Sequence, residues 1–255
     1  MLASALCLRL ALAAWSASLP STHELATGGA DPSEPLPLVV ALHGRGSSSD
    51  SITRTLRSIG LPARVVALDG PRASGLGRAW FHTRLTTRDV AGLERALATE
   101  ADRVAGTVTR VEATRPTCGR TIVVGVSQGG AVGLAYAARH GEHTATVVQM
   151  SSWTPPSLRP GTDVTVSVMH GTADRRIPYR RVSRMVDDLR ATGTQVDLRT
   201  FDGDGHRPSS AGRQALRRAV ATAVQAELAS EDCRSRRAGA LSQSRVSPRA
   251  SRDAD

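Results

Sequence analysis

The chain has 255 residues, of which 40% are hydrophobic and 3% aromatic, and a formal net charge of +10 at pH 7. This length suits one domain with a buried core, and the composition excludes fibrous and wholly disordered proteins. All 33 basic residues are Arg, but they are scattered and no nucleic-acid-binding motif accompanies them, so we expect no specific nucleic-acid partner.

The N-terminal segment is apolar from Met1 to Leu19 and ends in small residues. It resembles the hydrophobic region and cleavage site of a secretory signal peptide, although it lacks a basic start and Arg9 interrupts it. We therefore predict a signal peptide at residues 1–19 and a secreted or periplasmic protein, with a cytoplasmic protein as the alternative. The segment is too interrupted for a transmembrane span, which needs about 20 mostly uncharged residues. Residues 20–35 are polar and rich in Pro and Gly, which predicts a linker.

Short apolar runs and amphipathic segments alternate over residues 36–230. This alternation predicts one α/β domain with a mostly parallel sheet and helices on both faces. The predicted strands are 36–42, 63–68, 121–126, 145–150, 163–169 and 195–201, and the predicted helices are 87–113, 129–138, 182–191 and 210–228. From Glu231 onward no periodicity is visible, so we predict a disordered tail rich in Arg and Ser at residues 231–255.

Three cysteines are too few for a disulfide framework. Cys7 lies in the predicted signal peptide, which leaves Cys118 and Cys233. These two would pair if the protein is exported, but we favour two unpaired, inert thiols.

The strongest motif is Gly125-Val126-Ser127-Gln128-Gly129, a G-x-S-x-G at a predicted strand-to-helix turn. A serine at such a turn is held in strained backbone geometry with its hydroxyl above the sheet edge. The alternative is a glycine-rich turn that only starts a helix. The strand-to-helix context favours a nucleophile at Ser127.

A serine nucleophile needs a base and a carboxylate that orients the base, in the chain order Ser, Asp or Glu, His. Asp174 follows the strand at 163–169, and His206 follows the strand at 195–201. Both therefore lie at carboxyl ends of strands, where open α/β sheets place their sites. We prefer Asp174 to Asp202 and Asp204 as the acid, and we expect His170 to brace the acid loop.

The tetrahedral intermediate of acyl transfer requires backbone N–H donors. One should be the amide of Gln128, and the second should come from the glycine-rich loop at residues 43–46. This loop lacks the spacing of a Walker motif and the chain has no Lys, which excludes a nucleotide site of that kind.

Several motifs together resemble the carboxylesterase/phospholipase family, which includes the acyl-protein thioesterases. They are Leu42-His43-Gly44-Arg45-Gly46, Gly77-Arg78-Ala79-Trp80-Phe81, Gly125-Val126-Ser127-Gln128-Gly129-Gly130, Met150-Ser151-Ser152-Trp153, His170-Gly171-Thr172-Ala173-Asp174 with Ile177-Pro178, and Gly205-His206. The resemblance covers residues 36–225. It implies a single-domain α/β-hydrolase fold without a large cap, the triad Ser127, Asp174 and His206, and oxyanion donors at the amides of Arg45 and Gln128. It implies no cofactor and no metal.

The chain departs from the family at His82, where an acidic residue is common, and at Arg45, where an aliphatic residue is usual. Arg45 places a positive charge near the acyl site, and Arg72, Arg78 and Arg84 would flank the same mouth. This arrangement favours anionic esters, or is incidental to the Arg bias.

These observations predict a serine hydrolase that cleaves carboxylic esters or thioesters through an acyl-enzyme on Ser127. Trp80, Phe81 and Trp153 are candidates for a substrate pocket, or pack the edge of the sheet instead. The alternatives are an exported polyester or feruloyl-type esterase, and a non-catalytic binding protein on a hydrolase scaffold.

Overall fold

The computed structural model describes residues 22–246, so the predicted signal peptide at residues 1–19 lies outside the described residues. A seven-stranded sheet forms the centre of the domain, in the order β1-β3-β2-β6-β7-β8-β9. Only β1 runs antiparallel to its neighbour; the other pairs are parallel. The strands are β1 (Thr22–Ala26), β2 (Leu36–Leu42), β3 (Arg64–Leu68), β6 (Thr117–Val126), β7 (Thr144–Met150), β8 (Thr165–Gly171) and β9 (Gln195–Phe201). A small hairpin, β4 (Arg72–Ser74) and β5 (Gly77–Ala79), lies outside this sheet.

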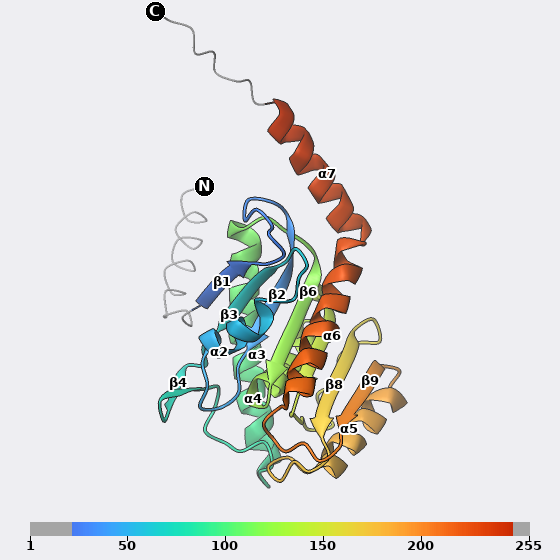
Figure 1. The fold of residues 1–255 in the computed structure, drawn as a ribbon. Helices are drawn as coiled ribbons and strands as arrows, with labels where there is room; N and C mark the ends of the chain where they lie inside the picture. Colours follow the sequence, from blue (N-terminus) through green and yellow to red (C-terminus); the bar gives the residue numbers. More distant parts are fainter. Residues whose placement is uncertain (1–21, 247–255) are drawn as a thin grey trace, which may run out of the picture.

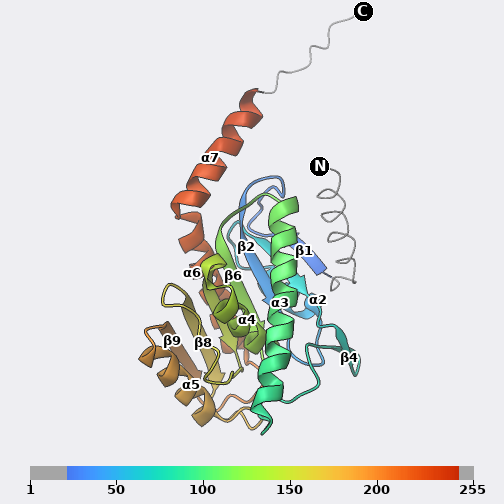
Figure 2. The ribbon, with the colours of Figure 1, turned by 180° about the vertical axis from the view of Figure 1, so that it is seen from behind.

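Helices cover both faces of the sheet (Figures 1 and 2). One face carries α2 (Ser49–Leu56) and α6 (Ser210–Leu228). The other carries α3 (Val90–Thr114), α4 (Gln128–Arg139) and α5 (Tyr179–Ala191). A short 3-10 helix, Gly141–His143, precedes β7. The predicted α/β class, the mostly parallel sheet and the helices on both faces are confirmed, and no cap domain is present within residues 22–246.

The central strands are buried on both faces because successive side chains of a strand point to opposite sides. Val40 and Leu42 pack with α3 and α4, whereas Val39 and Ala41 pack with α2 and α6. All residues of β2 are buried. This explains why β2 reads in the sequence as a continuous apolar run and not as an alternating one.

The strand order predicts a crevice at the carboxyl ends of β2 and β6. From β2 the chain passes to β3, which pairs with one edge of β2. The later strands are added from the other edge of β2, beginning with β6. The carboxyl ends of two strands that meet at such a reversal leave a crevice for a ligand. The loop at residues 43–46 follows β2 and Ser127 follows β6, so both lie at this crevice.

The predicted linker at residues 20–35 is wrong for residues 22–26, whereas residues 27–35 form turns and irregular chain between β1 and β2. Thr22–Ala26 forms β1, which pairs with β3 along its whole length. The buried guanidinium of Arg64 holds this segment, since it pairs with Glu24 and donates to the carbonyl of Pro32 at 2.6 Å. The sequence did not predict this strand because β1 is a mostly exposed edge strand, and its residues are therefore largely polar.

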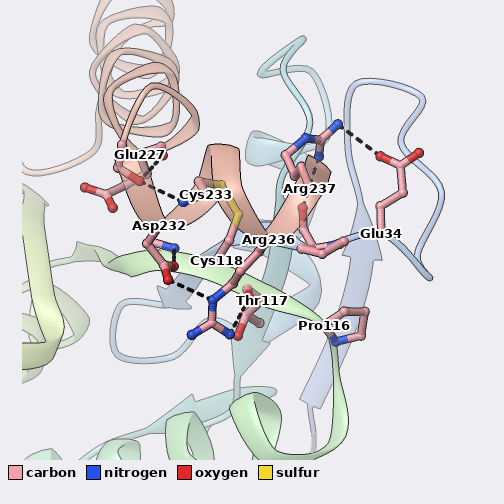
Figure 3. Close-up of a disulfide and its surroundings, with 12 residues drawn as sticks. Glu34, Pro116, Thr117, Cys118, Glu227, Asp232, Cys233, Arg236 and Arg237 are labelled. Atoms are coloured by element: carbon pink, nitrogen blue, oxygen red, sulfur yellow. Dashed lines mark hydrogen bonds and ion pairs between the residues drawn. A yellow bond between two sulfur atoms is a disulfide. The ribbon is translucent and has the colours of Figure 1, made fainter. Parts of the chain in front are cut away.

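The predicted disordered tail is also wrong over its described part, because residues Glu231–Val246 form α7. This helix projects beyond the end of the sheet (Figure 1). Its first turns are fixed by contacts to the start of β6 and to residues 34–35 (Figure 3). Asp232 accepts a hydrogen bond from the Gly119 amide at 2.8 Å, and Arg237 pairs with Glu34 at 3.0 Å. These partners are remote in sequence, so periodicity within the tail did not reveal the helix.

Cys118 and Cys233 form a disulfide, so the expectation of two inert thiols is wrong. The bond joins β6 to the first turn of α7 across 115 residues of sequence (Figure 3). Both cysteines are buried, with exposed fractions of 2% and 0%. The disulfide therefore closes a loop that contains most of β6, the strands β7, β8 and β9, and the helices α4, α5 and α6.

We predict that losing this disulfide lowers the free energy of unfolding by about 3–4 kcal/mol, because the unfolded chain regains the freedom of a long loop. Urea unfolding of the double variant Cys118→Ala/Cys233→Ala measures the change. A thiol reductant should lower the stability of the wild type to a similar extent and leave the variant unaffected. Equal stability of the oxidised wild type and the variant would contradict the prediction.

Candidate active site

Ser127 lies in a strained turn between β6 and α4, with φ 53° and ψ −117°. This backbone conformation costs a non-glycine residue free energy and persists only where the surroundings enforce it. The close approach of the flanking chain requires glycine on both sides. A Cβ at Gly125 would lie 2.4 Å from the carbonyl of Gly129, and a Cβ at Gly129 would lie 2.1 Å from the oxygen of Leu42.

Hydrogen bonds from the next strand hold the turn in place. The Ser127 amide donates to the carbonyl of Met150 at 2.9 Å, and the Ser152 hydroxyl donates to the carbonyl of Ser127 at 2.7 Å. Both backbone polar groups of Ser127 thus have a partner outside α4, and its carbonyl also accepts from the Ala131 amide within the helix at 3.2 Å. The side chain is left to point over the carboxyl edge of the sheet.

The structure brings together the three side chains that the sequence predicted for the triad. The Ser127 Oγ lies 3.0 Å from His206 Nε2, and His206 Nδ1 lies 2.7 Å from Asp174 Oδ2. A carboxylate only accepts hydrogen bonds, so Nδ1 carries the proton. His206 Nε2 is then free to accept the hydroxyl proton of Ser127, as a general base must do.

The Asp174 carboxylate is fully buried and its oxygens are satisfied by donors. Oδ1 accepts hydrogen bonds from the amides of Arg176 and Ile177 at 2.8 and 3.0 Å, while Oδ2 faces His206. Buried charges are tolerated when they are hydrogen-bonded in this way. The loop after β8 therefore fixes the orientation of the Asp174 carboxylate relative to the His206 imidazole.

Further hydrogen bonds join the acid loop to the loop that carries His206. The Ala173 amide donates to the carbonyl of Asp204 at 3.0 Å, and the Thr172 hydroxyl donates to the Asp202 carboxylate at 3.0 Å. Asp202 and Asp204, the competing candidates for the acid, thus connect the two loops and do not contact His206 through their carboxylates in the hydrogen bonds described for residues 22–246. A Cβ at Gly171 would lie 2.3 Å from the Asp204 oxygen, so glycine is needed for this close contact.

His170 lies behind the acid loop, in the position expected of a residue that braces it. Its Nε2 donates to the carbonyl of Ile177 at 2.9 Å and lies 3.5 Å from Asp174 Oδ2. Burial lowers the pKa of the imidazole, against the raising effects of the Ile177 carbonyl and the Asp174 charge. His170 is therefore neutral at neutral pH and adds no charge beside the triad.

The predicted oxyanion donors belong to two segments that line the same hollows as Ser127, the start of α4 and the loop after β2. The Gln128 amide is the first of α4, where an N–H has no partner within the helix. Arg45 lines the same hollows as Ser127, and no backbone acceptor is described for its amide within residues 22–246. A Cβ on Gly44 would lie 3.5 Å from the Ser127 Cβ, which shows how closely the loop approaches the nucleophile. No hydrogen-bond acceptor is described within residues 22–246 for either N–H group.

The side chain of Gln128, which the sequence did not single out, fixes the loop after β5. Its Oε1 accepts from the Trp80 amide at 3.2 Å and its Nε2 donates to the Phe81 carbonyl at 2.9 Å. Trp80 Nε1 in turn donates to the carbonyl of His43 at 2.8 Å. The Gln at this position in the nucleophile motif was the available sequence signal, but its partner loop is 48 residues away.

His43 completes this network from the loop after β2. Its Nδ1 donates to the carbonyl of Gly44 at 2.7 Å, and its Nε2 accepts from the Gly70 amide at 3.0 Å. Burial is the main effect on the imidazole and lowers its pKa. His43 is thus a neutral structural residue that holds the loop carrying Arg45.

The predicted substrate pocket of Trp80, Phe81 and Trp153 is wrong for the first two residues. Trp80 is fully buried and Phe81 is 3% exposed, so both pack in the core and offer no surface to a ligand. Trp153 lines a separate hollow of about 450 Å³, where the guanidinium of Arg181 lies 5.0 Å from its ring. The apolar character of Trp80 and Phe81 suggested a pocket, but it is also the reason that both rings are buried in the core.

Two hollows instead meet at Ser127 and His206. One, of about 570 Å³, is lined by Arg45, Arg84, Leu85, Thr86, Ser127, Gln128, Arg175, Arg176, Ile177 and His206. The other, of about 460 Å³, has an apolar wall that includes Ile52, Val126, Met150 and Leu216. Arg45 and Arg84 are therefore at the mouth as expected. Arg78 is not, because its guanidinium donates to the carbonyls of Gly70 and Pro71 at 2.9 Å.

Within residues 22–246 no group of three or more His, Cys, Asp or Glu side chains is placed to hold a metal ion. In the same part of the chain, no helix is long and apolar enough to cross a membrane.

We predict that Gln128→Met destabilises the domain by about 2–3 kcal/mol, because it leaves buried backbone groups of Trp80 and Phe81 without a partner. Urea unfolding measures the change. The control Gln214→Met, at an exposed position of α6, should stay within about 0.5 kcal/mol of the wild type. The same small effect for both variants would refute the role of the Gln128 amide.

Comparison with known protein families identifies the family of this chain. Residues 29–223 match the model of the phospholipase/carboxylesterase family. A search of curated protein sequences gave no significant match.

Solved structures share the fold at low sequence identity. Acyl-protein thioesterase 2 of Zea mays is 21% identical, with a TM-score of 0.62 over 80% of this chain and 99% of that one. The esterase PE8 is 22% identical, with a TM-score of 0.67 over 83% of this chain and 100% of that one. A carboxylesterase of Bacillus cereus is 15% identical, with a TM-score of 0.62 over 83% of this chain and 98% of that one. With its sheet order, its strained serine turn and the family match over most of its length, the chain belongs to the phospholipase/carboxylesterase family of α/β hydrolases.

Proposed function

We propose that this hydrolase cleaves carboxylic esters or thioesters through an acyl-enzyme on Ser127. The observation that carries the proposal is the continuous hydrogen-bonded chain from Ser127 Oγ through His206 to Asp174, with distances of 3.0 and 2.7 Å. A non-catalytic protein would not need a strained serine at the end of this series of hydrogen bonds. The geometry instead supports a working nucleophile.

In the first half of the reaction, His206 Nε2 takes the proton of the Ser127 hydroxyl while Oγ attacks the carbonyl carbon. The imidazolium that forms is stabilised by Asp174 through the Nδ1 proton. The amides of Arg45 and Gln128 donate to the negative oxygen of the tetrahedral intermediate. Each such donor is worth about 3 kcal/mol of transition-state stabilisation.

The intermediate then collapses as the bond from carbon to the leaving oxygen or sulfur breaks. His206 returns its proton to that leaving atom, so an alcohol or thiol departs and the acyl group remains on Ser127. Water repeats the sequence, with His206 as its base, and releases the carboxylic acid. No step requires a group beyond these side chains, two amides and water.

The hollows at Ser127 favour short or medium acyl groups over long lipid chains. Their volumes, about 570 and 460 Å³, are in the range of small-molecule sites. No cap within residues 22–246 covers them, so a long acyl chain would lie partly in water. We therefore expect activity to fall as the acyl chain grows beyond medium length.

We also propose that the protein matures in an oxidising compartment, as a secreted or periplasmic enzyme. The Cys118–Cys233 disulfide supports this, since such bonds persist outside the reducing cytosol. Alkylation of free thiols during lysis of the native cells, followed by mass analysis, checks it. Finding both cysteines alkylated would favour the cytoplasmic alternative.

We predict that Ser127→Ala abolishes hydrolysis of a panel of 4-nitrophenyl esters and acyl thioesters, with a loss of at least about a thousandfold in kcat. The hydroxyl is the only group that the proposal allows to form the acyl-enzyme. The control Ser58→Ala removes an exposed serine hydroxyl outside both hollows and should keep the wild-type rates. Comparable rates for Ser127→Ala and the wild type would disprove the mechanism, and the wild-type profile ranks esters against thioesters.

A further inference from the structure

Arginine side chains surround the nucleophile without carboxylates among them. Four line the larger hollow, and Arg207 and Arg213 join Arg45 and Arg176 in the smaller one. Neither hollow is lined by Asp or Glu. Asp174 lies beneath and is fully buried, so its charge is not presented to the hollows.

The six arginines are also free of ion pairs within residues 22–246. Their only side-chain hydrogen bonds described there go to backbone carbonyls, from Arg45 to His82 at 3.1 Å and from Arg213 to Pro208 at 2.7 Å. Elsewhere in the fold arginines commonly pair with carboxylates, as Arg139 does with Asp102 and Arg120 with Asp163. A bias towards Arg in the chain explains why these residues are not Lys. It does not explain why carboxylates are excluded around Ser127.

Three of the arginines that line the larger hollow lie on loops next to the triad. Arg175 and Arg176 directly follow Asp174, and the Arg176 amide binds the Asp174 carboxylate at 2.8 Å. Arg45 sits on the loop that approaches Ser127. Backbone contacts close to the triad thus fix the loops from which these arginine side chains extend.

Positive charges that line the same hollow repel each other and make its electrostatic potential more positive. An anion placed between them removes this repulsion and gains charge-assisted hydrogen bonds. Guanidinium groups offer several N–H donors in a planar fork that matches carboxylate and phosphate oxygens. The smaller hollow is also lined by four arginines, but it has in addition an apolar wall that suits an uncharged aliphatic group.

We propose that the larger hollow binds a carboxylate or phosphate group of the substrate, so that the preferred substrate is an ester or thioester with a negative charge near the scissile bond. This inference rests on the proposed function. The uncharged part of the substrate occupies the smaller hollow, against Ile52, Met150 and Leu216. Arg84, Arg175 and Arg176 determine the specificity and need not contact the carbonyl that reacts.

Matched thioester pairs test the inference, with thiol release as the readout. In the first pair the acyl group is glutaryl, which carries a free carboxylate, or its neutral amide 4-carbamoylbutanoyl. The thiol of both is N-acetylcysteamine. In the second pair the acyl group is butanoate, and the thiol is 3-mercaptopropionate or 3-mercaptopropionamide. A third arm replaces that thiol with 2-mercaptoethyl phosphate, which separates phosphate from carboxylate recognition. The arms also show whether the charge belongs to the acyl or the leaving group.

We expect kcat/KM for the anionic member of at least one pair to exceed that of its neutral isostere by about tenfold at low ionic strength. Raising the salt from about 0.05 to 0.5 M should reduce this preference, because screening shortens the reach of exposed charges. Each of Arg84→Gln, Arg175→Gln and Arg176→Gln should lower the ratio of anionic to neutral rates roughly two- to fivefold. The triple variant should remove most of the preference.

The control is Arg218→Gln, which removes an exposed arginine of α6 that lines neither hollow. Its ratio should equal that of the wild type, which separates a local effect from a change in net charge. Equal rates on the charged and neutral members of every pair would overturn the inference and leave the esterase proposal standing. Absence of hydrolysis for all substrates, anionic and neutral, would instead count against the proposed function.

Discussion

The active site depends on the close approach of the turn at Ser127 to the end of β2. The positive φ of Ser127 and the narrow gap between Gly129 and Leu42 allow α4 to start directly over the neighbouring strand. This packing places the first free amide of α4 and the loop at residues 43–46 around the serine hydroxyl. The strain of the turn is offset by hydrogen bonds to Met150 and Ser152. Any side chain larger than hydrogen at Gly125 or Gly129 would force these elements apart.

The remaining two triad residues are positioned by polar contacts between loops and not by apolar packing. Asp174 is held by backbone amides of its own loop, and that loop is held by the one that carries His206. The neutral imidazoles of His43 and His170 brace the neighbouring loops without adding charge. The mouth differs from this interior, since its charges are exposed, of one sign and unpaired within the described residues. The same site thus combines a hydrogen-bonded imidazole with a surface of unpaired positive charge.

Most of the fold was predictable because its strands are buried on both faces and read as apolar runs. The predicted strand at 36–42 and helix at 210–228 match the observed β2 and α6 in both bounds. The juxtaposition of Ser127, Asp174 and His206 followed from their places at the ends of parallel strands. Features held by contacts remote in sequence were missed, namely β1 through Arg64, α7 through the Cys118–Cys233 disulfide, and the loop held by Gln128. Trp80 was misassigned because aromatic character does not distinguish a pocket wall from the core.

The proposed mechanism requires His206 to activate Ser127. Labelling with a fluorophosphonate, followed by peptide mass analysis and timed against the variant His206→Gln, tests this activation. We predict a single adduct on the peptide containing Ser127 in the wild type. Labelling should be slowed by at least about a hundredfold in the folded variant, because removing the base leaves a hydroxyl of ordinary reactivity. An adduct on another residue, or equal labelling rates in the two proteins, would contradict it.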